Sequence, residues 1–159
     1  MVTLFAALLT LSAEQAQVPA TFITKEEHEA VLKDQTAKNV VDQPITASEV
    51  IGGKASVAML RRVKPEASAL IHDYVTETYY IMSGSGTFVT GGRLGDAKPT
   101  DLTRVNAGMS QTGTRIGGES RRVKPGDIII VPAGTPHSFS ELDGPINYLV
   151  YRFEPTAKK

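Results

Sequence analysis

The sequence predicts a single all-β domain, either a sandwich or a barrel, with one helix at its N-terminal edge. Short apolar runs recur along most of the chain and are separated by turns rich in Gly and Pro, which is typical of short antiparallel strands. Only one segment, near residue 30, has apolar residues at helical spacing. The 159 residues are 41% apolar, which is enough for one hydrophobic core.

The charge and cysteine content exclude several classes of function. Seventeen basic residues balance seventeen acidic ones, so nothing favours binding to nucleic acid or to an anionic membrane surface. The chain has no cysteine, which excludes disulfides, thiolate zinc sites and a cysteine nucleophile. A metal ion would therefore be held by histidines and carboxylates, which suit Fe, Mn, Ni, Co, Cu or Zn.

The N-terminus is typical of a signal peptide. Residues 1–11 are nearly all apolar and are followed by small residues up to Ala16, as in a cleavable export signal. The apolar run is too short to span a membrane. We therefore expect residues 1–16 to be removed and the mature protein to be secreted or periplasmic, without membrane contact. The alternative is an N-terminal helix packed on the domain, and the protein would then be cytoplasmic.

Residues 17–54 are expected to form a helix and an edge segment ahead of the main domain, residues 55–155. Thr24 and Glu27 fit a capping box, which predicts a helix over residues 25–37. An apolar segment containing Pro44 follows, and proline is tolerated in a sheet chiefly at an edge.

The main domain contains a series of short strand signals. They fall at residues 55–63, 68–74, 77–82, 87–90, 119–123 and 147–153. Residues 91–118 are rich in Gly, Thr and Ser and lack a clear period. We expect a long loop there that is functional or mobile, with at most short strands, for example around residues 102–105.

Two turns, a strand and a histidine come together towards the end of the chain. A turn at residues 125–127 precedes a β-branched run, residues 128–131, which fits a buried strand, and a second turn rich in Pro and Gly follows. His137 comes directly after this turn. In a strand, it would share one face with Phe139 and Glu141.

The spacing of Gly126, Pro132, Gly134 and His137 resembles the second sequence motif of the cupin family. In that family the histidine of this motif is a metal ligand. The motif usually ends in Asn, and this chain has Glu141 in its place.

Part of the first cupin motif is also present. Glu77 and Gly84 have its spacing, and His72 stands where its second histidine would be. The position of the first histidine is Leu70, and Lys64 replaces the leading glycine. The resemblance implies a cupin jelly-roll β-sandwich or barrel with one divalent metal ion at its mouth.

His72, Glu77 and His137 are the candidate metal ligands. Two imidazoles and one carboxylate from three strands can hold one face of an ion and leave other positions open for water, dioxygen or a substrate oxygen. Leu70 in place of a fourth ligand would make the site more open and the binding weaker.

Side chains on neighbouring strand positions are expected to line the pocket. They are Met59, Leu70, Tyr79, Ile81 and Phe139. No catalytic residue is assigned, and Tyr79 and Glu141 are the candidates for moving protons.

Two classes of function fit these residues. The first is a metal-dependent enzyme acting on a small organic molecule: a mononuclear non-haem oxygenase, similar to a dioxygenase, if the metal is Fe(II), or else an isomerase or lyase. The second is a non-catalytic module that binds a sugar or organic acid, with or without a metal, and closes residues 91–118 over it. The resemblance also implies a homodimer, for which edge strands near residues 40–50 are candidates.

Overall fold

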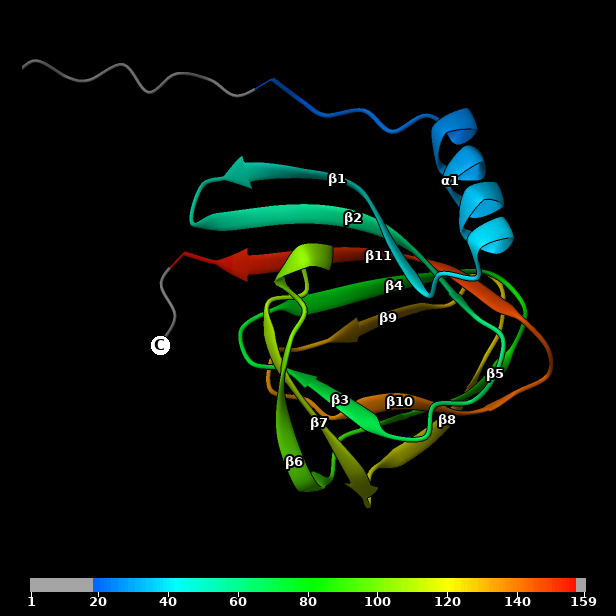
Figure 1. Cartoon of the computed structure of the whole chain (residues 1–159), viewed down its shortest axis with the longest axis vertical. Coiled ribbons are helices and arrows are strands. Elements are labelled where there is room, and N and C mark those ends of the chain that lie inside the picture. Colours follow the sequence, from blue (N-terminus) through cyan, green and yellow to red (C-terminus); the bar gives the residue numbers. More distant parts are fainter. Residues whose placement is uncertain (1–18, 157–159) are drawn as a thin grey trace, which may run out of the picture.

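A computed structural model describes residues 19–156, so the predicted signal peptide lies outside the described residues. Two antiparallel sheets face each other and enclose the core (Figure 1). The strands are β1 (Asp42–Val50), β2 (Gly53–Arg62), β3 (Ala69–His72), β4 (Thr76–Ser83), β5 (Gly86–Thr90), β6 (Arg93–Asp101), β7 (Met109–Ile116), β8 (Glu119–Val123), β9 (Ile128–Val131), β10 (His137–Leu142) and β11 (Ile146–Pro155).

The strand order is that of a jelly roll, as the sequence predicts. One sheet has the order β1-β2-β11-β4-β9 and the other the order β6-β7-β3-β10-β5-β8. Strands β4 and β10, which carry motif residues, therefore lie in different sheets. Side chains of Glu77 on β4 and His137 on β10 can therefore meet only in the space between these sheets.

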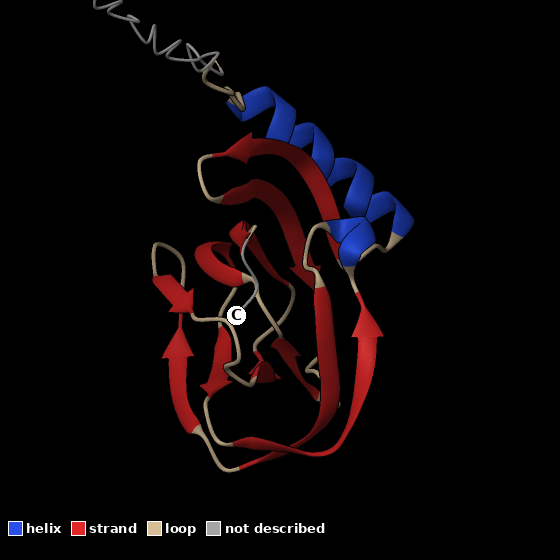
Figure 2. Cartoon of the chain, turned by 90° about the vertical axis from the view of Figure 1, so that its left-hand side faces the viewer, coloured by secondary structure: helices blue, strands red, loops and turns tan. Residues whose placement is uncertain are grey.

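The helix α1 (Lys25–Lys38) lies outside this sandwich, beside β1 and β2 (Figure 2). The predicted capping box is present, because the Thr24 side chain accepts a hydrogen bond from the Glu27 backbone and Glu27 accepts one from Thr24. The helix ends at Asn39, which adopts the left-handed conformation. Gln35 is buried under the helix and donates to the backbone carbonyls of Val41 and Met59. Among the described residues, no helix is long and apolar enough to cross a membrane.

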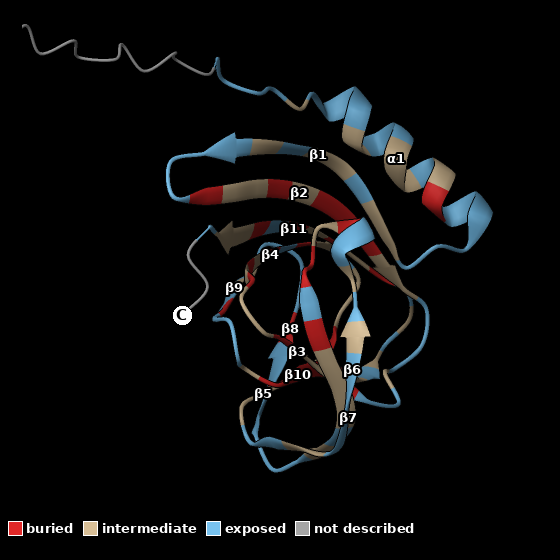
Figure 3. Cartoon of the chain, turned by 60° about the vertical axis from the view of Figure 1, so that its left-hand side comes forward, coloured by how far each residue is buried: buried red, intermediate tan, exposed pale blue. Residues whose placement is uncertain are grey.

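The core lies between the two sheets and follows the two-residue period of the strands (Figure 3). In β11, for example, Ile146, Tyr148 and Val150 are fully buried, whereas Tyr151 is 46% exposed. The buried cluster consists of Ala58, Leu60, Tyr79, Ile81, Phe88, Val123, Val131, Phe139, Ile146, Tyr148 and Val150.

The expectation of a long loop at residues 91–118 is wrong. This region forms the hairpin of β6 and β7, joined through the short 3-10 helix η1 (Thr103–Val105). The hairpin lies at the edge of its sheet, so most of its side chains face solvent and the sequence carries little apolar alternation. A register shift between Gly95 and Lys98 interrupts the pattern further.

One other expectation needs correction. Residues 128–131 form an edge strand rather than a buried one, and Ile128 and Ile130 are 67% and 66% exposed. The expected boundary between residues 54 and 55 lies within β2, which pairs with β1 from Asp42 onward. β1 is an edge strand, as Pro44 predicts, and its register shifts at that proline.

Candidate metal centre

Side chains of His72, Glu77 and His137 converge between the two sheets. They come from the end of β3, the start of β4 and the start of β10. The Nε2 atoms of His72 and His137 lie 3.3 and 3.4 Å from Oε2 of Glu77, and one ligand atom from each residue lies within 4.8 Å of the others. All three side chains are buried. The structure thus brings together the three residues that the motifs single out.

Hydrogen bonds at Nδ1 fix the orientation of each histidine ring. Nδ1 of His137 lies 3.0 Å from the carbonyl oxygen of Thr135, which can only accept, so Nδ1 carries a proton. Nδ1 of His72 lies 2.9 Å from Oγ of Ser110. The Ser110 hydroxyl donates to the backbone carbonyls of residues 107 and 108, so it accepts from His72. Both imidazoles therefore turn Nε2 towards Glu77.

Glu77 is held through both of its oxygens. Arg152 donates from Nε to Oε1 over 2.8 Å, and the Tyr79 hydroxyl donates to Oε2 over 2.6 Å. Oε2 is also the oxygen that faces both histidines. The carboxylate therefore presents a single oxygen to the pair of imidazoles.

Arg152 belongs to the site, although the sequence reasoning missed it. It is 2% exposed, and Asp42 binds its two Nη atoms at 3.3 and 2.6 Å. Nη1 also donates to the carbonyl of Val105 over 2.7 Å. The sequence did contain a signal for this residue. Arg152 continues the alternation of inward-facing positions along the last strand, and a buried cation needs an anionic partner.

Burial and the neighbouring charges act against each other on the pKa of Glu77 and of His137, but act together on that of Tyr79. Burial would raise the pKa of Glu77, but hydrogen bonds from His137 and His72 and the charge of Arg152 hold this pKa well below its ordinary value. Burial would lower the pKa of His137, but the Glu77 carboxylate raises it above 6.5. Burial and the Glu77 charge raise the pKa of Tyr79 well above 10, so its hydroxyl stays protonated.

Two predicted pocket residues, Leu70 and Tyr79, adjoin this cluster. Leu70 pairs directly with His137 across β3 and β10 and shares the face of His72. Tyr79 and Ile81 alternate inward with Glu77 along β4, and Phe139 is fully buried in the same core.

Two of the predicted site residues lie elsewhere. Met59 alternates with Ala58 and Leu60, which face the core, so it lies on the outer face of β2 beneath α1. Glu141 is exposed and accepts a hydrogen bond from the Thr87 hydroxyl. A register shift between Phe139 and Glu141 breaks the alternation that would have placed Glu141 beside His137.

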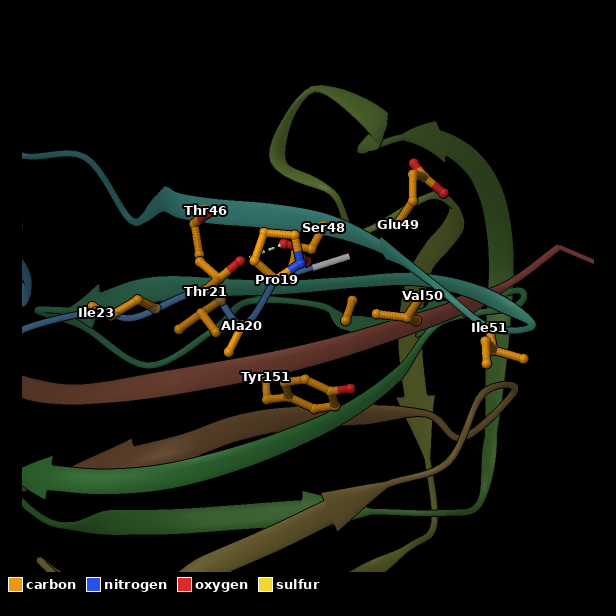
Figure 4. Close-up of a pocket in the computed structure, with 13 residues that line it drawn as sticks. Pro19, Ala20, Thr21, Ile23, Thr46, Ser48, Glu49, Val50, Ile51 and Tyr151 are labelled. Atoms are coloured by element: carbon orange, nitrogen blue, oxygen red, sulfur yellow. Dashed lines mark hydrogen bonds between the residues drawn. The ribbon is translucent and has the colours of Figure 1, made fainter. Parts of the chain in front are cut away.

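Two grooves on the described part of the chain lie away from the cluster. One, of about 830 Å³, runs on the outer face of β1, β2 and β11 and is bordered by Tyr151 and by the segment from Pro19 to Ile23 (Figure 4). The other, of about 550 Å³, lies beside β8 and β9. Neither is lined by His72, Glu77 or His137.

No family model and no curated protein matches the sequence. Among solved structures, BH2720 from Bacillus halodurans is similar, with 17% identity over 87% of this chain and 85% of that chain and a TM-score of 0.52. DMSP lyase DddQ from Ruegeria pomeroyi DSS-3 matches with 18% identity over 68% of this chain and 41% of that chain, with a TM-score of 0.43. A cupin superfamily protein from Desulfitobacterium hafniense DCB-2 matches with 14% identity over 72% and 76%, with a TM-score of 0.43.

Proposed function

We propose that this chain, whose fold is that of the cupin superfamily, is a metal-dependent enzyme acting on a small organic molecule. His72, Glu77 and His137 would hold one divalent ion. The observation that carries the proposal is the state of the two imidazoles. Each gives its Nδ1 proton to a fixed acceptor and turns Nε2 towards the same carboxylate oxygen, which is how metal-ligating histidines are usually oriented.

The donor set of two nitrogens and one oxygen fits Fe, Mn, Ni, Co, Cu or Zn. When bound, such an ion supplies Lewis-acid chemistry, or oxygenase chemistry if it is Fe(II), at positions that the three protein ligands leave open. The remaining residues orient these ligands. Thr135 and Ser110 fix the two imidazoles, and Arg152 fixes the carboxylate.

Tyr79 acts in this site as a hydrogen-bond donor rather than as a base. Its hydroxyl donates to Glu77 and its pKa is raised well above 10, so it does not accept a proton at neutral pH. Leu70 adds apolar bulk next to His137 and leaves the fourth ligand position without a donor. A substrate would therefore meet the ion beside an apolar wall.

A second candidate function is a non-catalytic module that binds a small ligand such as a sugar or organic acid. The observation in its favour is that neither of the two grooves reaches the cluster. Incubation of metal-loaded protein with a panel of sugars and organic acids separates the two functions. A ligand that binds and is recovered unchanged by NMR supports the module, and a new product supports the enzyme.

Metal content tests the proposed site. The chain has three histidines, so His28 on α1 provides a matched control. After loading and buffer exchange, wild type and His28→Ala should retain about one ion per chain by elemental analysis, because three protein ligands remain. His137→Ala and His72→Ala should retain none. Full occupancy in these two variants, or no metal in wild type, would contradict the proposal.

Export and homodimerisation remain predictions. The mature N-terminus of protein expressed in an exporting host tests the first, because cleavage after residue 13 or 16 would remove the apolar segment. Light scattering of the purified protein tests the second through its molar mass.

A further inference from the structure

One loop contacts side chains on both sheets that orient the cluster. The loop, residues 102–108, joins β6 to β7 and is called the strap below. It contains η1 and is closed by hydrogen bonds between the backbones of Leu102 and Gly108 and of Ala107 and Leu102. Val105 is 5% exposed and Ala107 is 1% exposed. The strap therefore packs its apolar side chains inward although it connects the edge strand β6 to its neighbour β7.

On the side of the first sheet, the strap acts on Glu77 through Arg152. The carbonyl of Val105 accepts from Nη1 of Arg152 at 2.7 Å, while Nε of the same guanidinium donates to Glu77. A guanidinium is planar and rigid, so fixing its Nη atoms also fixes the direction of its Nε–H. Asp42 holds the other side of the fork.

On the side of the second sheet, the strap acts on His72 through Ser110. The Ser110 hydroxyl lies 3.3 Å from the carbonyl oxygens of both Ala107 and Gly108 and accepts the Nδ1 proton of His72. Without these carbonyls the hydroxyl has no fixed direction, and His72 loses the acceptor that sets its ring orientation. A further contact, from Lys54 Nζ to Asn106 Oδ1 at 2.5 Å, ties the strap to β2.

We propose that the strap is a closure element and that Arg152 is the positioning residue through which closure orients Glu77. When the strap is closed, Glu77 presents one oxygen and His72 presents Nε2; when it opens, Arg152 loses the Val105 carbonyl and Ser110 loses the two carbonyls that fix its hydroxyl. This inference rests on the proposed function for its link to the metal, because Glu77 and His72 are two of the three ligands. By linkage, metal binding and closure favour each other by the same factor.

Opening of the strap can be measured by proteolysis at a site within it. Arg104 is exposed, and the bond that follows it lies inside η1, where Val105 is buried. Trypsin needs this bond extended, so cleavage after Arg104 reports the open fraction. The rate is measured by mass spectrometry on native, metal-free protein.

Arg62 provides a matched control for Arg152. It is the corresponding inward arginine at the end of β2 and bonds Glu66 and Tyr148 rather than the strap. Arg152→Met should be cleaved after Arg104 about tenfold or more faster than Arg62→Met. Each variant is measured at the same number of degrees below its own thermal unfolding midpoint. Equal rates in the two variants would overturn the proposal, because general destabilisation would then explain both.

A second pair of variants, with smaller changes, tests the proposal if Arg152→Met does not fold. Ser110→Ala removes the support of His72, and Ser56→Ala removes a buried hydroxyl of β2 that makes no hydrogen bond to the strap. Ser110→Ala should increase cleavage after Arg104, and Ser56→Ala should leave it unchanged. Equal cleavage in this pair would likewise overturn the proposal.

Experiments with Zn²⁺ distinguish a failure of the strap proposal from a failure of the proposed metal site. Zn²⁺ should slow cleavage of wild type after Arg104, and Arg152→Met should weaken Zn²⁺ binding by about 10–100-fold, the usual cost of losing a group that orients a ligand. Arg62→Met should bind Zn²⁺ as wild type does. If wild type binds no Zn²⁺, the proposed metal function fails, and the metal-free comparison of the variants still decides the role of the strap. Zinc that binds wild type without slowing cleavage would overturn the coupling.

Discussion

Leu70 and His137 face each other directly in the ladder between β3 and β10. Leu70 also lies two residues before His72 on the same face of β3. An imidazole at position 70 would therefore point towards the same space as the Nε2 atoms of the two histidines. The leucine keeps the cluster at three candidate ligands.

Leu70→His should convert the site into one with four ligands. We expect Zn²⁺ affinity to rise by about tenfold, equivalent to about 1.4 kcal/mol, because the added nitrogen needs little rearrangement of the strand. Competition with a colorimetric chelator measures the change. Ile71→His places the same side chain on the opposite face of β3 and should leave affinity unaltered; an equal gain in both variants would mean that position 70 does not face the ion.

Glu77→Gln should lower the stability of the metal-free protein by about 3–5 kcal/mol, because it removes the buried carboxylate charge that faces the two histidines and leaves Arg152 paired with Asp42 alone. Denaturant unfolding measures this free energy. Glu141→Gln makes the same chemical change at an exposed position and should stay within about 0.5 kcal/mol of wild type. Similar losses in both variants would argue against the central place of Glu77 in the buried network.

Zinc binding should depend on the protonation of His137. Glu77 raises the pKa of His137 above 6.5 in the metal-free protein, and a protonated Nε2 cannot bind an ion. Affinity should therefore rise about tenfold per pH unit below this pKa and level off above it. Calorimetry in buffers of different ionisation enthalpy should show a proton released on binding, and a pH-independent affinity between 5 and 7 would contradict this role of His137.

The same shift sets the stability of the metal-free protein. The folded pKa of His137 is raised, so its pairing with Glu77 stabilises the fold fully below about pH 6.5, and this contribution is lost as pH rises through the raised pKa. The unfolding free energy of wild type relative to His137→Gln should therefore shrink as pH increases from 6 to 9. A difference that grows over this range would have the wrong sign.

The sequence predicted the helix and those strands whose apolar residues recur at a regular spacing. The capping box of α1 and the strand signals around β2, β4, β5, β8, β10 and β11 correspond to elements of the structure. The hairpin of β6 and β7 was missed because nearly all side chains of both strands are exposed or half-buried, so these strands are held by pairing that the local sequence does not record. For the same reason, the apolar run of β9 looked buried although it forms an edge.

For the site, spacing was enough to select His72, Glu77 and His137, because turns fix where their strands begin. It was not enough for Arg152 or Ser110. Arg152 reaches Glu77 from 75 positions away, and Ser110 reaches His72 from 38 positions away, so only the folded sheets bring these pairs together. Glu141 was misplaced by a register shift in β10, which strict alternation does not foresee.

The state of the imidazole nitrogens tests the central claim most directly. Long-range ¹⁵N–¹H spectra resolve the ring nitrogens of the three histidines, and loss of one set of signals in each histidine variant assigns them. On addition of one equivalent of Zn²⁺, Nε2 of His72 and of His137 should shift to metal-bound values while their Nδ1 atoms stay protonated, and the signals of His28 should not move. Unshifted Nε2 signals in His72 and His137 at saturating Zn²⁺ would contradict the metal site.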